Sequence, residues 1–160
     1  MPLLMIRDRR FYSVAFSSDG TRIVSGSENR SVQVWDESTG EELRKLDGHS
    51  HIVQCVAFSN DGTRIVSGSD DRSVRVWDVL TSAELRKLVG HSNIVYSVAF
   101  SSDDAYIVSG SRDKSVWVWD ASTGAELRKL TDHLNPVRSV AFSNDGTRIV
   151  SGSEDKSVRV

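Results

Sequence analysis

The chain has 160 residues, with 20 Lys and Arg against 22 Asp and Glu, which gives a formal net charge of −2. This balance excludes a strongly basic protein of the kind that binds nucleic acid or an anionic membrane through a basic stripe. The apolar stretch 3–6 is too short for a secretory signal, and no later run could form a membrane-spanning helix. Cys55 is the only cysteine, so no internal disulfide forms. We therefore expect a single domain, 1–160, in the cytoplasm, with the nucleus as the alternative.

Three residue types recur along the chain with a period of 42 residues. They are Trp35, Trp77 and Trp119; His49, His91 and His133; and Phe16, Phe58, Phe100 and Phe142. A spacing kept without insertions indicates that one structural unit has been copied. The copies cover approximately residues 7–48, 49–90, 91–132 and 133–160.

Each copy is predicted to contain four short strands joined by polar turns. In the third copy these are 95–100, 106–110, 116–119 and 126–130, which are rich in residues that suit a pleated surface. Asp-Gly pairs between the first two strands indicate tight hairpins. Consecutive apolar residues such as Ile107 and Val108 point to opposite faces, so both faces must be covered. Four-stranded sheets that stack radially satisfy this requirement.

Several short motifs recur together in fixed register. They are Gly48-His49 and Gly90-His91 at the start of copies, Trp35-Asp36, Trp77-Asp78 and Trp119-Asp120 at the end of the third strands, and Ser67-Gly68-Ser69 and Ser109-Gly110-Ser111 before Asp71 and Asp113. From about residue 11 to 160 the chain resembles the WD-repeat family. The resemblance implies an all-β fold of propeller blades with four antiparallel strands each. About four blades are expected.

The resemblance also implies a structural hydrogen-bonded tetrad inside each blade. Two copies carry it complete: His49, Ser67, Asp71 and Trp77, and His91, Ser109, Asp113 and Trp119. The first copy has Arg7 and Asn29 in place of the histidine and aspartate, and keeps Ser25 and Trp35. The last copy has His133, Ser151 and Asp155, and the chain stops one residue before the expected tryptophan. We expect these two outer blades to be weaker.

Ser, His and Asp together could also form a hydrolase triad, so we weighed an enzyme against a scaffold. The constellation recurs in successive copies, each with its tryptophan, and no G-x-S-x-G elbow is present. His49 and His51 alone are too few ligands for a metal site, and no glycine-rich phosphate loop occurs. We therefore predict no catalytic residue, no metal and no cofactor.

Binding should depend on the exposed positions at which the copies differ. Three such sets exist: Tyr12, Gln54, Tyr96 and Arg138; Glu28, Asp70, Arg112 and Glu154; and Arg10, Ile52, Ile94 and Pro136. The family resemblance places all three on the top face of the propeller, around its channel. Tyr and Arg are frequent interface anchors. Neutral drift on a solvated surface is the alternative explanation.

The sequence thus favours a non-catalytic protein-interaction scaffold that binds a peptide or protein partner through the top face. One alternative is a fragment of the recognition domain of a larger multidomain sensor protein. Another is a purely structural subunit that assembles through its rim and lateral surface. Neither nucleic acid nor a membrane is expected as a partner.

Trp117 stands where the other copies have the polar residues Gln33, Arg75 and Arg159. This indicates a position that is normally solvated. We expect Trp117 to pack against Tyr106, which itself replaces an arginine, or to offer an apolar contact to a partner.

The sequence leaves three arrangements open for closure of the propeller ring. The chain could be a fragment of a larger propeller, or two chains could close an eight-bladed ring as a homodimer. In that ring, residues 1–5 would supply the missing fourth strand of the last blade. A closed four-bladed monomer is the least favoured arrangement.

Overall fold

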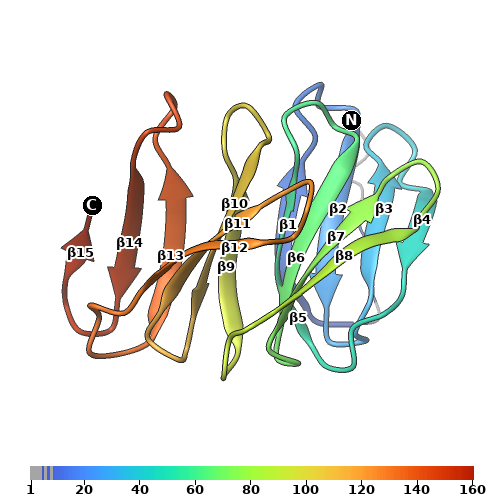
Figure 1. Ribbon diagram of the computed structural model, residues 1–160. Helices are drawn as coiled ribbons and strands as arrows, with labels where there is room; N and C mark the ends of the chain where they lie inside the picture. Colours follow the sequence, from blue (N-terminus) through green and yellow to red (C-terminus); the bar gives the residue numbers. More distant parts are fainter. Residues whose placement is uncertain (1–4, 6, 8) are drawn as a thin grey trace.

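A computed structural model describes residues 5, 7 and 9–160, and its regular structure is all β-strand (Figure 1). The strands are β1 Phe11–Phe16, β2 Arg22–Ser27, β3 Val32–Asp36, β4 Glu42–Leu46, β5 Val53–Phe58, β6 Arg64–Ser69, β7 Ser73–Asp78, β8 Glu84–Val89, β9 Val95–Phe100, β10 Tyr106–Ser111, β11 Val116–Asp120, β12 Glu126–Leu130, β13 Val137–Phe142, β14 Ile149–Ser153 and β15 Val158–Arg159. In the third copy, the strand ends lie within one residue of those predicted from the sequence.

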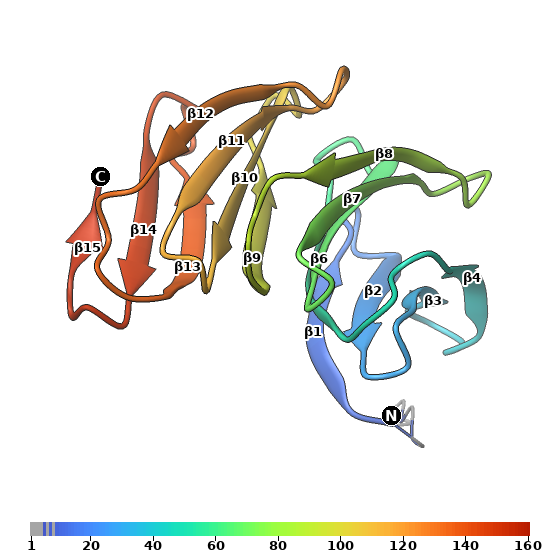
Figure 2. The ribbon, with the colours of Figure 1, turned by 60° about the horizontal axis from the view of Figure 1, so that its bottom comes forward.

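Each copy of the repeat folds into one antiparallel sheet in which strands that are consecutive in the chain are neighbours. Three sheets have four strands, β1–β4, β5–β8 and β9–β12, and the sheet β13–β15 has three. We call these sheets blades 1 to 4. The first strands β1, β5, β9 and β13 contact one another in series. The blades therefore form an open arc, with β4, β8 and β12 on its outer side (Figure 2).

The core is divided among the contacts between neighbouring blades. One cluster joins blades 1 and 2 through residues such as Val24, Leu46 and Trp77, and a second joins blades 2 and 3 around Trp119. A smaller cluster joins blades 3 and 4. Burial on both faces explains why the inner strands carry consecutive apolar residues. The fold is that of propeller blades stacked on one another.

The glycine of each Ser-Gly-Ser motif lies where the next blade comes closest. A Cβ atom on Gly68 would lie 2.6 Å from Cγ1 of Val95 on β9, and one on Gly26 would lie 2.7 Å from Cγ1 of Val53 on β5. No side chain fits at that distance, so the motif is a packing requirement of the blade-to-blade contact. Gly152, in blade 4, has no atom within 4 Å of such a Cβ.

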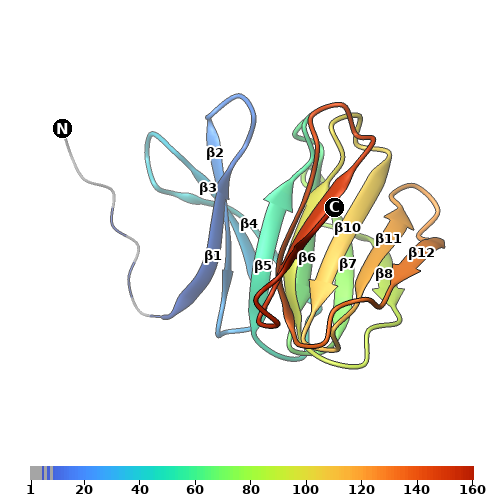
Figure 3. The ribbon, with the colours of Figure 1, turned by 90° about the vertical axis from the view of Figure 1, so that its left-hand side faces the viewer.

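The two ends of the arc lie apart, as the view along the side of the molecule shows (Figure 3). The described residues therefore do not form a closed four-bladed ring. We expected residues 1–5 to pair as a fourth strand. Residues 1–4 lie outside the described part of the chain, and Met5 is not part of a strand.

Candidate functional site

Two hydrogen-bonded networks join the four predicted residues in blades 2 and 3. In blade 3, Nε1 of Trp119 donates to Oγ of Ser109 at 2.9 Å, and this oxygen lies 2.8 Å from Nε2 of His91. Nδ1 of His91 lies 2.8 Å from Oδ2 of Asp113. Because Ser109 accepts the indole proton, its own proton can go to Nε2 of a neutral His91, whose Nδ1–H then donates to Asp113.

Blade 2 repeats this geometry in every contact. The distances are 2.8 Å from Trp77 to Ser67, 2.7 Å from Ser67 to His49 and 2.8 Å from His49 to Asp71. Both serines are completely buried. A substrate cannot reach a hydroxyl that is buried and already bonded on both sides, so this geometry gives no nucleophile.

The aspartates of these networks are held in the ionised form. Burial of Asp71 opposes ionisation, but hydrogen bonds from His49 and Ser73 outweigh it and lower the pKa of Asp71 below its ordinary value. Burial also opposes ionisation of Asp113, but hydrogen bonds from His91 and Ser115 outweigh it and lower the pKa of Asp113 below its ordinary value. Each carboxylate also accepts the backbone N–H at the start of its blade, that of Ser50 or Ser92. The network therefore fixes the segment between two blades as well as the turn.

The outer blades contain parts of the network. In blade 4, His133 lies 2.8 Å from Ser151 and 2.7 Å from Asp155. In blade 1, Trp35 still donates to Ser25, at 2.8 Å. Asn29 accepts hydrogen bonds from its own turn, and Arg7 contacts Met5 through Nε, so neither replaces the missing histidine and aspartate.

Trp117 corrects one expectation from the sequence. Its side chain is buried, with 6% of its surface exposed, and its ring stacks on Trp119. Tyr106 pairs with Asp120 in the strand register, so it lies on the other face of the sheet and is not the packing partner. The position is not normally solvated either, because Gln33 and Arg75 are also buried.

The three variable sets of side chains meet at one end of each blade. We call this end, where the first strand begins and the second strand ends, the top face; it points down in Figure 1. In each blade a backbone hydrogen bond joins the second and third sets. The pairs are Glu28 to Arg10, Asp70 to Ile52, Arg112 to Ile94 and Glu154 to Pro136, at 2.9–3.0 Å.

A β-bulge places the first variable set on this face. The register of the first two strands skips one residue in every blade, and the skipped residues are Tyr12, Gln54, Tyr96 and Arg138. A bulge turns the side chain of its extra residue away from the regular alternation. The sequence carried no signal for it, because the bulge appears only in the pairing of two strands.

Neighbouring top-face side chains contact one another. Gln54 donates to Asp70 at 2.8 Å within blade 2, and Nε of Arg138 donates to Glu154 at 2.6 Å within blade 4. Between blades 3 and 4, the guanidinium of Arg138 lies 4.1 Å from the ring centre of Tyr96. The bulge residues of blades 3 and 4 are therefore in direct contact.

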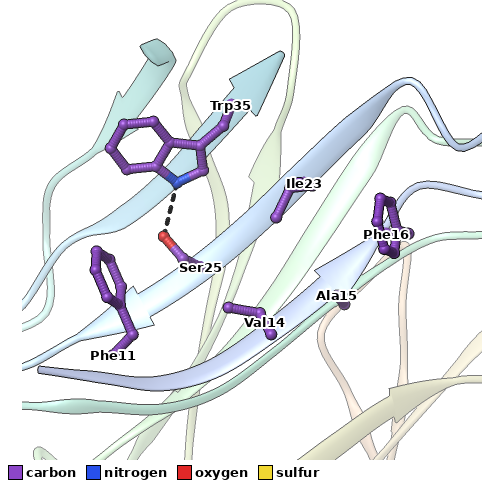
Figure 4. A pocket seen from close by; sticks show the side chains of 7 residues that line it. All are labelled: Phe11, Val14, Ala15, Phe16, Ile23, Ser25 and Trp35. Carbon is purple, nitrogen blue, oxygen red and sulfur yellow. Dashed lines mark hydrogen bonds between the residues drawn. The ribbon is translucent and has the colours of Figure 1, made fainter. Parts of the chain in front are cut away.

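A second surface is the outer face of blade 1. Val14 and Phe16 are 67% and 63% exposed there, and the hollow between them and Trp35 has a volume of about 320 Å³ (Figure 4). The equivalent valines Val56 and Val98 are buried against the preceding blade. This exposed face of blade 1 corresponds to the face that each later blade packs against the blade before it.

Within residues 5, 7 and 9–160, no group of three or more His, Cys, Asp or Glu side chains is arranged to hold a metal ion. In the same part of the chain, no helix is long and apolar enough to cross a membrane.

Comparison with known proteins agrees with this architecture. The curated relatives match only a short part of the chain: 41% identity over 44 residues with the dynein assembly factor with WD repeat domains 1 of Xenopus laevis, and 39% over 44 residues with the Danio rerio protein of that name. A match to the probable serine/threonine-protein kinase PkwA of Thermomonospora curvata has 42% identity over 53 residues. These matches cover 28%, 28% and 33% of this chain, and 11%, 11% and 7% of the relatives.

The family model described as "WD domain, G-beta repeat" matches four times, at residues 8–36, 40–78, 82–120 and 124–160. The last three matches begin just before the outer strand of one blade and end at the third strand of the next, so they divide the repeat at a different point from the sheets. Together they cover almost the whole chain, which therefore belongs to the WD-repeat family.

Proposed function

We propose that this protein is a non-catalytic interaction scaffold that binds a peptide or protein partner through its top face. Proteins built from WD repeats generally serve as scaffolds for protein–protein interaction. The observation that carries the proposal is the β-bulge, which in all four blades brings the most variable side chain to the same face. Invariant positions hold the blades together, and the variable ones lie at the same end of every blade.

Two tyrosines at opposite ends of blade 3 provide a matched test. Tyr96 lies on the top face, whereas Tyr106 is exposed at the opposite end, at the start of β10. In affinity capture with quantitative mass spectrometry, Tyr96→Ala should lose the partners that the Tyr106→Ala variant retains. Equal capture by both variants, with both folded, would contradict a top-face site.

A second candidate is the recognition part of a larger sensor protein. The match to a probable protein kinase favours it, since only 7% of that protein lies in the match. An antibody against residues 49–132 can show the size of the native polypeptide in the producing cells. A band well above that of a 160-residue chain supports this candidate, and a band of that size contradicts it.

A third candidate is assembly with a second copy through the outer face of blade 1. The exposure of Val14, whose equivalents Val56, Val98 and Val140 are buried, and of Phe16 beside it favours this assembly. Light scattering should then detect a homodimer that Val14→Asp converts to a monomer. A well-folded monomer of the unsubstituted chain would contradict this assembly.

A further inference from the structure

The turn between the second and third strands carries a cation at the same place in every blade. These residues are Arg30, Arg72, Lys114 and Lys156, with φ of 71°, 69°, 74° and 67°. All four are exposed. A left-handed backbone is unfavourable for a residue with a side chain and is free for glycine.

Two other turns of the repeat also need a left-handed residue, and there the chain mostly uses glycine. The glycines are Gly20, Gly62 and Gly146 in one turn and Gly40 and Gly124 in the other. Asp104 and Ser82 are the exceptions. Glycine is therefore sufficient where only a left-handed backbone is required. The turn on the top face instead has a positively charged residue in all four copies, Arg in two and Lys in two.

These cations have no internal role in the described part of the chain. None of the four side chains makes a hydrogen bond or an ion pair with residues 5, 7 or 9–160. The top-face acids, in contrast, are engaged: Glu28 accepts the backbone N–H of Arg10, Asp70 accepts from Gln54, and Glu154 pairs with Arg138. Glu28 and Asp70 accept from uncharged groups and keep their charge, whereas Glu154 is paired with Arg138. The four turn cations outnumber these two carboxylates, although the chain as a whole has a net charge of −2.

The positive charge is greatest on blade 3. Arg112 stands where the other blades have Glu28, Asp70 and Glu154. In blades 2 and 4 the residue at this position bonds to the bulge residue, and in blade 3 the two equivalent residues are Arg112 and Tyr96. Arg138 packs on the same tyrosine, and Lys114 follows two residues after Arg112. Tyr96 therefore lies among cations contributed by two blades.

We propose that the top face around Tyr96 binds an acidic peptide segment, with Arg112 and Lys114 contacting its carboxylates. This inference rests on the proposed function and names the chemistry of its partner. Arginine and lysine form their strongest hydrogen bonds with ionised acceptors, and an aromatic ring between cations can pack on the backbone of the segment. A long nucleic acid fits less well than a short acidic segment, because it would extend from blade 3 to Glu28 and Asp70 on blades 1 and 2, which would repel its phosphates.

The test measures, by fluorescence anisotropy, how tightly the protein binds two fluorescein-labelled peptides. In the first peptide, Glu residues are separated by Gly and Ser; in the second, every Glu is replaced by Gln. The Glu peptide should bind more tightly, and its affinity should fall as salt is added. Arg112→Gln should weaken it about tenfold, the effect of losing one charge-assisted contact. Lys114→Gly should also weaken it, without strain in the turn, because glycine adopts this φ freely.

Two controls keep the result specific. Lys114→Arg retains the charge found at Arg72 and should bind like the unsubstituted protein. Lys87→Gln removes an exposed cation from β8 on the outer rim and should leave the affinity within about twofold. A Lys87→Gln loss as large as that of Arg112→Gln would overturn the inference, as would an absence of binding to either peptide or tighter binding of a single-stranded oligonucleotide.

The outcomes also separate this inference from the proposed function. If both peptides bind equally and Tyr96→Ala weakens both, peptide binding by the top face stands and the acidic preference is wrong. If both bind equally and Tyr96→Ala changes neither, the top-face site is wrong as well.

Discussion

The indole of Trp117 lies almost parallel to that of Trp119, with ring centroids 5.0 Å apart and an interplanar angle of 22°. Nε1 of Trp117 donates to Oγ of Ser115 at 2.7 Å, and Nζ of Lys129 lies 4.8 Å from its ring centroid. A Cβ atom on Gly90 would lie 2.2 Å from the ring of Trp117. The glycine of this Gly-His motif thus makes room for the stacked pair.

Replacing Trp117 should reveal how much this packing stabilises blade 3. We expect Trp117→Ala to lower the free energy of unfolding by about 3–5 kcal/mol, as for other buried aromatics. Trp117→Arg should cost less, because Arg75 at the equivalent place pairs with Glu84, and Glu126 stands where that glutamate does. Urea denaturation measures both. Unchanged stability of Trp117→Arg together with lost partner binding would instead make Trp117 a contact residue.

The tetrad of blade 3 should behave as a structural unit. Trp119→Ala is expected to cost about 3–5 kcal/mol through the lost aromatic core. His91→Ala should cost about 1–3 kcal/mol, because it leaves Ser109 and Asp113 without their shared partner. His51 is exposed, so His51→Ala is the matched control and should change stability by no more than about 0.5 kcal/mol. Both tetrad variants melting like the control would contradict the structural role.

The period of 42 residues made the blades predictable, because each copy repeats the same strand and turn signals. The top-face geometry was less accessible. The family resemblance gave the face, but the bulge that exposes Tyr96 depends on how β9 pairs with β10, and no local residue pattern encodes that register.

The polarity at the position of Trp117 gave a wrong prediction for a physical reason. Gln33 and Arg75 were expected to be solvated, yet each is buried with a partner for its polar atoms. Gln33 bonds to Glu42 and to Arg9, and Arg75 to Glu84. A polar residue can be buried when a strand neighbour satisfies it, and residue type alone does not show that neighbour.

Turn aspartates predict a loss of stability in acid. The backbone N–H of Thr123 and the hydroxyl of Ser122 lower the pKa of Asp120 from 3.8 to about 2, and the Ser143 hydroxyl lowers that of Asp145 from 3.8 to about 2. A carboxyl whose folded pKa lies below its unfolded value stabilises the fold above the unfolded pKa and loses this contribution as the pH falls through the folded pKa.

The melting temperature should therefore change little above about pH 5 and fall as the pH decreases from about 4 towards 2. Circular dichroism at low ionic strength measures it. An Asp120→Asn, Asp145→Asn variant should show a smaller decrease over the same range, since it has lost two of the titrating groups. A melting temperature that stays constant or rises between pH 4 and 2 would contradict the assignment of these carboxylates.

Asp104 and Ser82 offer a matched pair for the contact between blades 2 and 3. Both have a left-handed backbone where other copies use glycine, with φ of 58° and 65°. The carboxylate of Asp104 accepts from N and Nδ2 of Asn60, at 2.7 and 2.9 Å, and from N of Asp61 at 3.0 Å. The hydroxyl of Ser82 makes no hydrogen bond with the described residues.

Glycine at either position removes the backbone strain, but only at Asp104 does it also remove contacts to the neighbouring blade. We expect Ser82→Gly to change the free energy of unfolding by less than about 1 kcal/mol, since relief of strain and the greater entropy of the unfolded chain oppose each other. Asp104→Gly should lower it by about 2–4 kcal/mol, because it removes three hydrogen bonds to a charged acceptor, while new hydration of the donors and relief of the strain offset part of the loss. Urea denaturation of the two variants gives the comparison directly. Equal stabilities would show that the Asp104 contacts do not stabilise the packing of blade 2 on blade 3. A loss of stability in Asp104→Gly alone would show that the Asp104 carboxylate, which the other copies lack, stabilises this contact between blades.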